Sequence, residues 1–219
     1  MQMIRLTLML LFCAGIANAQ ASDGSAVQRV VKGQSLESQE APRATLEFEK
    51  GFKYLGGQSF SLYGVAEAEQ HLFVKPGSDG SVDRFYWVQF EHYLPSNTHT
   101  YNYKPERTTQ VGDFQFIYDT AAFNDYSAVN GNPESDGARA VAMLAKNGLS
   151  FPKRLARIRM FYLPNPDRRS ELMIIYGEAL AADAKVVMSD DGSLLDEQSP
   201  EVAKMIRMHA ADGVKITKR

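Results

Sequence analysis

Apolar and polar residues alternate along most of residues 44–118, which is the periodicity of a β-strand with one buried face. The segment TLEFEKGFKYLGG places Leu46 and Phe48 on one face, with Glu47 and Glu49 on the other. QSFSLYG repeats this alternation, and EQHLFVKPGSDGSVDRFYWVQFEHYL indicates two strands joined by the turn residues PGSDGS. With FQFIYD as a further strand, this part of the chain predicts a mainly antiparallel sheet.

Helical periodicity replaces alternation at SDGARAVAMLAKNGL, for which we predict a helix over about 136–147, capped by Ser135 or Asp136. The segment SPEVAKMIRMHAA predicts a second helix over about 200–210. Between them, RIRMFYL and ELMIIYGEAL indicate strands, and the second is apolar on both faces, as in a covered central strand. This order predicts a single α+β domain: a twisted sheet of about six to eight strands packed by two helices.

The first 19 residues have the features of a signal peptide. One cation, Arg5, precedes an apolar run over 6–16, and the small residues Ala17 and Ala19 suit the −3 and −1 pockets of a signal peptidase. We predict cleavage between Ala19 and Gln20, with export to the periplasm or the outside of the cell. The apolar run is shorter than the roughly 20 residues that span a bilayer, so no transmembrane segment is expected.

The remaining chain is predicted to be a polar, flexible leader over 20–43 and one domain over 44–219. The only cysteine, Cys13, lies in the predicted signal peptide, so the exported protein would have no disulfide. The 24 basic and 26 acidic residues nearly balance, which argues against a nucleic-acid partner.

The stretch 84–103 holds seven aromatic residues and two histidines in twenty positions. Alternation sends two sets of side chains to opposite faces: Phe85, Trp87, Gln89, Glu91 and Tyr93, and then Tyr86, Val88, Phe90, His92 and Leu94. The second set is more apolar and is assigned to the core, with His92 near its buried end. The first set is either an ordinary strand face, since aromatic residues favour strands, or a wall for a flat, amphipathic ligand such as a sugar. The second interpretation makes Trp87, Gln89, Glu91 and Tyr93 ligand-binding candidates.

The three histidines His71, His92 and His99 fall within 29 residues and can offer imidazoles to zinc or copper. No two of them have the i, i+2 or i, i+4 spacing of a tight ligand pair, and Pro95 lies between the last two. A histidine-based metal site is therefore an alternative rather than the favoured function, and the sequence indicates no cofactor.

A catalytic function needs an acid or base with a partner. The candidates are His92, His99, Glu91, Tyr101 and Glu178. Across the turn that follows the aromatic strand, Glu91 can meet Tyr101, or His92 can meet His99. The chain has no G-x-S-x-G or H-E-x-x-H motif. An enzyme would therefore be a hydrolase or lyase of the acid–base type.

Arg157 and Arg159 share one face of a strand and can fork onto a carboxylate or phosphate. They are ligand-binding candidates for that reason. The alternative is that they form the solvated face of an edge strand, paired with the acidic residues of 183–201.

The favoured function is a non-catalytic domain that binds a small molecule, a saccharide or a protein partner in a sheet-lined groove with aromatic walls. An acid–base hydrolase or lyase and a histidine-based metal-binding protein are the alternatives. The sequence does not indicate the ligand or the oligomeric state.

Overall fold

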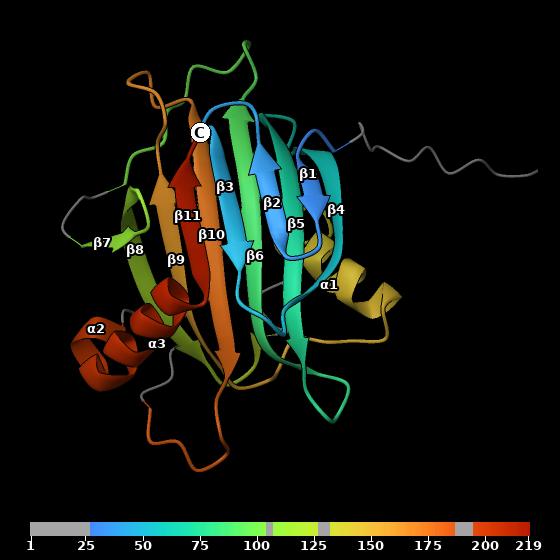
Figure 1. The fold of residues 1–219 in the computed structure, drawn as a ribbon, viewed down its shortest axis with the longest axis vertical. Coiled ribbons are helices and arrows are strands. Elements are labelled where there is room, and N and C mark those ends of the chain that lie inside the picture. Colours follow the sequence, from blue (N-terminus) through green and yellow to red (C-terminus); the bar gives the residue numbers. More distant parts are fainter. Residues whose placement is uncertain (1–26, 104–106, 127–131, 187–194) are drawn as a thin grey trace, which may run out of the picture.

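The computed structural model describes residues 27–103, 107–126, 132–186 and 195–219. Within these ranges the chain folds into one α+β domain with two antiparallel sheets, as Figure 1 shows. In chain order the elements are β1 (Val30–Lys32), β2 (Ser35–Ser38), β3 (Ala44–Phe48), β4 (Lys53–Leu62), β5 (Ala66–Pro76), β6 (Val82–Tyr93), β7 (Thr108–Val111), β8 (Phe114–Phe123), α1 (Asp136–Lys146), β9 (Leu155–Tyr162), β10 (Ser170–Ala179), α2 (Leu195–Gln198), α3 (Pro200–Asp212) and β11 (Val214–Lys218). The predicted fold class is confirmed, and the two predicted helices are α1 and α3.

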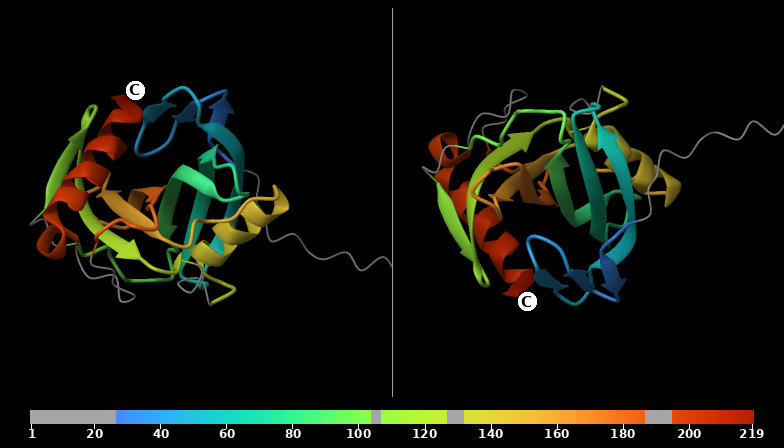
Figure 2. Two further views of the ribbon diagram at one scale, coloured as in Figure 1. Left: turned by 90° about the horizontal axis from the view of Figure 1, so that it is seen from below. Right: turned by 90° about the horizontal axis from the view of Figure 1, so that it is seen from above.

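The large sheet has seven strands in the order β4-β5-β6-β10-β9-β8-β7. It curves strongly, so that it wraps around the small sheet and α3 in the end-on views of Figure 2. Its centre is the pair β6–β10, whose register runs from Ser170 opposite His92 to Glu178 opposite Arg84. Strand β10 is buried on both faces, as its continuous apolar sequence predicted.

The small sheet has the order β1-β2-β3-β11 and begins before the predicted start of the domain at Ala44. The prediction of a flexible leader is therefore wrong from β1 onward. Strands β1 and β2 are short, but backbone pairing of β1 with β2 and of β2 with β3 satisfies N–H and C=O groups along them, and Leu36 of β2 is fully buried. The predicted signal peptide and residues 20–26 lie outside the described ranges.

Each face of the large sheet packs against its own layer. The small sheet and α3 cover the concave face, where Phe48 of β3 contacts Tyr86 with their ring centroids 5.1 Å apart. Helix α1 covers the convex face, where Leu144 belongs to the same buried cluster as Phe85 and Trp87. Both side-chain sets of β6 are therefore buried, although the sequence had assigned only one of them to the core.

The helices are short surface elements with one buried stripe. The first turn of α1 is capped as predicted, because the Ser135 hydroxyl accepts a hydrogen bond of 3.0 Å from the Ala138 N–H. Helix α3 begins at Pro200 and buries Ala203, Ile206 and Ala210. In the part of the chain that the structure describes, no helix has the length and apolarity to cross a membrane.

Candidate functional site

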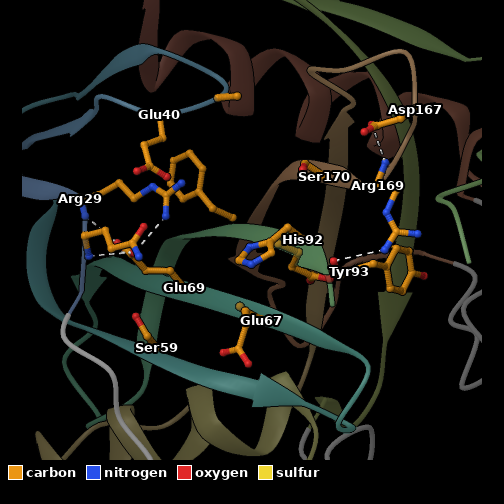
Figure 3. A pocket seen from close by; sticks show the side chains of 15 residues that line it. Arg29, Glu40, Ser59, Glu67, Glu69, His92, Tyr93, Asp167, Arg169 and Ser170 are labelled. Atoms are coloured by element: carbon orange, nitrogen blue, oxygen red, sulfur yellow. Dashed lines mark hydrogen bonds and ion pairs between the residues drawn. The ribbon is translucent and has the colours of Figure 1, made fainter. Parts of the chain in front are cut away.

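A cavity of about 760 Å³ opens between the two sheets, beyond the apolar core, where β6 ends and β10 begins. In Figure 3, Arg29, Glu40 and Glu69 lie on one side of it, Tyr93 and Arg169 on the other, and His92 between them. The residues that line the cavity are Gln28, Arg29, Glu40, Ala41, Ser59, Glu67, Ala68, Glu69, Phe90, Glu91, His92, Tyr93, Asp167, Arg169 and Ser170. The lining is thus largely polar, with Phe90 and Tyr93 as its aromatic members.

Three strands place a polar row across the floor of the cavity. In the register of the large sheet, His92 lies opposite Glu67 on β5 and opposite Ser170 on β10. Directly opposite residues of an antiparallel pair have their Cβ atoms about 4.5–5.5 Å apart on the same face. The sheet therefore holds a carboxylate, an imidazole and a hydroxyl side by side.

Glu69 anchors one wall of the cavity. Its carboxylate accepts hydrogen bonds from the backbone N–H groups of Gln28 (2.9 Å) and Arg29 (2.8 Å) and pairs with the Arg29 guanidinium at 3.0 Å. His71 Nε2 lies 2.8 Å from the same carboxylate, and the Tyr54 hydroxyl lies 3.0 Å from His71 Nδ1. This network joins the segment before β1 to β5 and β4.

The charge of Glu69 is stabilised by these contacts. Burial alone raises the pKa of this carboxyl, but the hydrogen bonds from His71 and the two backbone N–H groups, together with the charge of Arg29, lower its pKa to about 2. The pKa of Tyr54 rises to about 12 because its hydroxyl is buried and close to the charge of Glu69.

The cations of the cavity are already engaged. Arg29 pairs with Glu69 and lies over the Phe90 ring, 4.3 Å from its centroid. Arg169 donates to the backbone carbonyls of Tyr93 (3.4 Å) and Leu94 (2.7 Å). By contrast, no described residue forms a hydrogen bond or ion pair with the carboxylates of Glu40 and Glu67. The cavity therefore offers acidic groups to a ligand.

The convex face of the large sheet holds a second polar cluster, which is closed. Glu91 on β6 and Glu171 on β10 are directly opposite in register and are 8% and 3% exposed. The segment 94–103, which we call the strap, covers them. The Tyr101 hydroxyl donates to Glu91 at 2.9 Å, and the Tyr103 hydroxyl donates to Glu171 at 2.6 Å.

Within the described ranges, no cation forms an ion pair with either of these two carboxyls. Burial and the neighbouring charge of Glu91 raise the pKa of Glu171 to about 8. Burial also raises the pKa of Glu91, against the hydrogen bonds from Gln89 and Tyr101. The charge of Arg159 lowers the pKa of Glu171, but this guanidinium is itself forked onto Asp119.

The predicted aromatic wall divides between these two places. Trp87 is only 2% exposed, and its indole N–H donates to the Gln89 side chain at 2.7 Å beneath α1. Tyr93 and Glu91 border the cavity where β6 ends, but their side chains belong to the convex face, where the Tyr93 ring stacks on Tyr101 and the Glu91 carboxylate accepts from the Tyr101 hydroxyl. The predicted contact between Glu91 and Tyr101 is confirmed.

The histidines are not brought together. His71 is fully buried in the Glu69 network. The sequence placed His92 near the buried end of the core face, but it is exposed, because this end of β6 lines the cavity between the two sheets. His99 is exposed in the strap, with its ring 6.4 Å from that of Tyr93. Among the described residues, no three His, Cys, Asp or Glu side chains form a group that could hold a metal ion.

The remaining candidates have structural partners. Arg159 forks onto the carboxylate of Asp119 with distances of 3.0 and 2.6 Å, and Arg157 lies over Phe123. Their strand β9 is not an edge strand, because it lies between β10 and β8. Glu178 lies at the other end of the concave face from the cavity and accepts from the Tyr176 hydroxyl at 2.8 Å.

Sequence reasoning missed Glu69, Glu67, Ser170 and Glu171. An acidic residue at every second position of the apolar strand β5 was the available signal for the first two, since strand alternation puts them on one face. Ser170 and Glu171 gave no local signal, because only the β6–β10 register places them beside His92 and Glu91.

No family model, curated protein or solved structure matches this chain. The geometry of the described residues is therefore what bears on its function.

Proposed function

We propose that the protein is a non-catalytic binding protein that takes a small organic cation into the cavity between its two sheets. A volume of about 760 Å³ is within the range of roughly 300–1,000 Å³ typical of small-molecule sites. The observation that carries the proposal is that this cavity holds two carboxylates, those of Glu40 and Glu67, for which no described residue is a partner.

The charge balance of the cavity selects the ligand class. Its acidic side chains Glu40, Glu67, Glu69 and Asp167 outnumber the basic Arg29 and Arg169, and both guanidiniums are held by protein acceptors. A protonated amine can pair with the unpartnered carboxylates, and an anion would meet the same carboxylates unfavourably. Phe90 provides apolar surface for the carbon skeleton of the ligand.

The test is calorimetric titration of the protein with putrescine, spermidine and glucosamine, with glucose and glucuronate as uncharged and acidic comparisons. We expect the amines to bind and the acidic sugar not to bind. Glu67→Gln should weaken amine binding at least about tenfold, since a charge-assisted hydrogen bond contributes about 1.5–3 kcal/mol.

Glu47→Gln is the matched control. Glu47 is exposed on β3 outside the cavity, and its substitution changes the net charge by the same amount as Glu67→Gln. Equal binding of glucose and glucosamine, or equal effects of the two substitutions, would contradict a cation site.

The row of Glu67, His92 and Ser170 supports a second candidate, acid–base hydrolysis. In that function His92 would act as the base, oriented by Glu67, with Ser170 or a water molecule as the group it deprotonates. A panel of small ester and amide substrates tests this candidate: turnover that His92→Gln abolishes would establish it over simple binding, and absence of turnover at every pH from 5 to 9 would exclude it for that panel.

A further inference from the structure

We propose that the pair of Glu91 and Glu171 holds a single proton when the protein is closed, and that loss of this proton releases the strap from the convex face of the large sheet. This device lies on the opposite face of the sheet from the carboxylates of the cavity and does not depend on the proposed ligand. The observation behind the proposal is that two buried carboxyls lie beneath the strap, and that the strap is attached to the sheet by hydrogen bonds to these carboxyls.

The strap is held from two sides. On one side, Arg168 Nε donates to the Tyr101 carbonyl at 2.7 Å, and Arg169 donates to the Leu94 carbonyl at 2.7 Å. On the other side, the hydroxyls of Tyr101 and Tyr103 donate to the two buried carboxyls. The arginine contacts use backbone carbonyls and do not titrate, whereas the tyrosine contacts end on groups that do.

A ladder of rings joins the strap to the sheet. The Tyr101 ring stacks on Tyr93 with 4.6 Å between centroids, and the Tyr103 ring stacks on Phe161 at 4.1 Å. Tyr101 and Tyr103 are themselves 6.2 Å apart and nearly parallel, at 13°. The rings exclude water from the carboxyls as long as both hydroxyls stay in place.

Every element that faces the carboxyl pair contributes to its charge balance. Asp136 of α1 adds a third acidic group, and its carboxylate lies 3.3 Å from the Gln89 amide that also donates to Glu91. Arg159 of β9 is the opposing cation: its charge lowers the pKa of Glu171, but its guanidinium is hydrogen-bonded to Asp119 of β8. Tyr63, after β4, faces Glu134, Asp136 and Glu91, while Tyr93 faces both glutamates and Arg169. Three carboxyls and one shared guanidinium favour retention of a proton.

Ionisation of both carboxyls has a direct structural consequence. Two adjacent negative charges in a water-excluded site repel one another and lose solvation, and entry of water relieves both effects. Departure of Tyr101 and Tyr103 from their acceptors uncovers the two carboxyls and lets this water in. The pKa of Glu171, about 8, places this opening in mildly alkaline solution.

Hydrogen exchange read by mass spectrometry, corrected for the intrinsic pH dependence of exchange, tests the device. Protection of 94–103 should fall at least tenfold between pH 7 and pH 9 in the unmodified protein and stay constant in Glu171→Gln. The matched control is Glu178→Gln, which changes a buried glutamate of the same strand on its other face and should keep the pH-dependent loss. Protection that does not change with pH in the unmodified protein would overturn the proposal.

Tyr103→Phe separates a switch from a simple structural role. Its hydroxyl lowers the pKa of Glu171, so its removal should raise the midpoint of the transition while it reduces strap protection at every pH. Reduced protection with an unmoved midpoint would show that the strap does not sense this carboxyl.

Infrared spectroscopy keeps the proposal testable if a variant folds poorly. The unmodified protein at pH 7 should show the carbonyl stretch of a protonated carboxyl, and this band should vanish by pH 10. The double variant Glu91→Gln, Glu171→Gln should lack the band at both pH values. Absence of the band from the unmodified protein at pH 7 would refute the retained proton.

Discussion

The two faces of the large sheet hold buried glutamates in opposite electrostatic states. On the concave face, Glu69 meets a guanidinium and two backbone N–H groups, and its pKa falls to about 2. On the convex face, Glu171 meets a tyrosine hydroxyl and another carboxyl, and its pKa rises to about 8. The two residues are 4% and 3% exposed, and burial raises the pKa of both carboxyls; only at Glu69 do the neighbouring donors and the charge of Arg29 reverse the direction of the shift.

The difference gives each face its own dependence on pH. The pKa of Glu69 is lower in the folded protein than its usual 4.5, so its contribution to stability is present above pH 4.5 and is lost as the pH falls toward 2. The pKa of Glu171 is raised, so its contribution is full below pH 4.5 and is lost as the pH rises through about 8. Together the two groups favour the folded state in mildly acidic solution.

The largest effect is expected from Trp87→Ala on the convex face. Trp87 is 2% exposed and donates to Gln89, so its removal should lower the free energy of unfolding by about 4 kcal/mol, measured by urea denaturation. Val141→Ala, at an exposed position of α1, is the control and should have little effect. If the Trp87→Ala protein instead keeps normal stability and loses ligand binding, Trp87 contacts the ligand rather than stabilising the fold.

A smaller but still large effect is expected from Glu69→Gln on the concave face. The substitution leaves the guanidinium of Arg29, whose side chain is only 11% exposed, without its counter-charge, and should cost about 3 kcal/mol at pH 7. The loss should shrink as the pH falls from 4.5 to 2, which thermal unfolding at several pH values measures. Glu47→Gln is again the surface control. If the loss of unfolding free energy in Glu69→Gln stays constant with pH, Glu69 is not the group whose protonation destabilises the protein between pH 4.5 and 2.

The smallest effect, and the one of opposite sign, is expected from Glu171→Gln. At pH 5 the amide replaces a neutral carboxyl and should change stability little. At pH 9 it removes a buried negative charge whose cost is partly relieved by opening of the strap, so it should raise the free energy of unfolding by only about 1–2 kcal/mol. Urea denaturation at the two pH values checks this difference, and a destabilised variant at pH 9 would show that the ionised form of Glu171 is well accommodated.

Much of the secondary structure could be predicted because it depends on neighbours in sequence. Alternation and apolar runs located β3 to β6 and β8 to β10, although not β7 or β11, and the cap at Ser135 located the start of α1 within a residue. The contact of Glu91 with Tyr101 was also within reach, since the two residues flank a single turn. The short strands β1 and β2 could not be found, because they are stabilised by the pairing of β1 with β2 and of β2 with β3 rather than by their own side-chain pattern.

The candidate site was predictable only in part, for a related reason. Tyr93, Glu91 and His92 were named from the sequence and do line the cavity, but Glu67 and Ser170 join His92 only through strand register. A shift of register by one residue would turn each of these side chains to the other face. Local sequence does not specify that register between strands as far apart in sequence as β6 and β10.

The sequence alone determined that successive side chains of 85–93 point to opposite sides of a strand, since this follows from backbone geometry. Only the tertiary structure decided which side opens to water. Strand β11, paired with β3, covers one face, and α1 packs on the other, so both faces are covered by residues distant in sequence. The alternation of side chains within the covered strand does not reveal which distant element packs on it. The face assigned to the core thus carries the cavity at its end, while the tryptophan predicted to meet a ligand lies sealed beneath a helix.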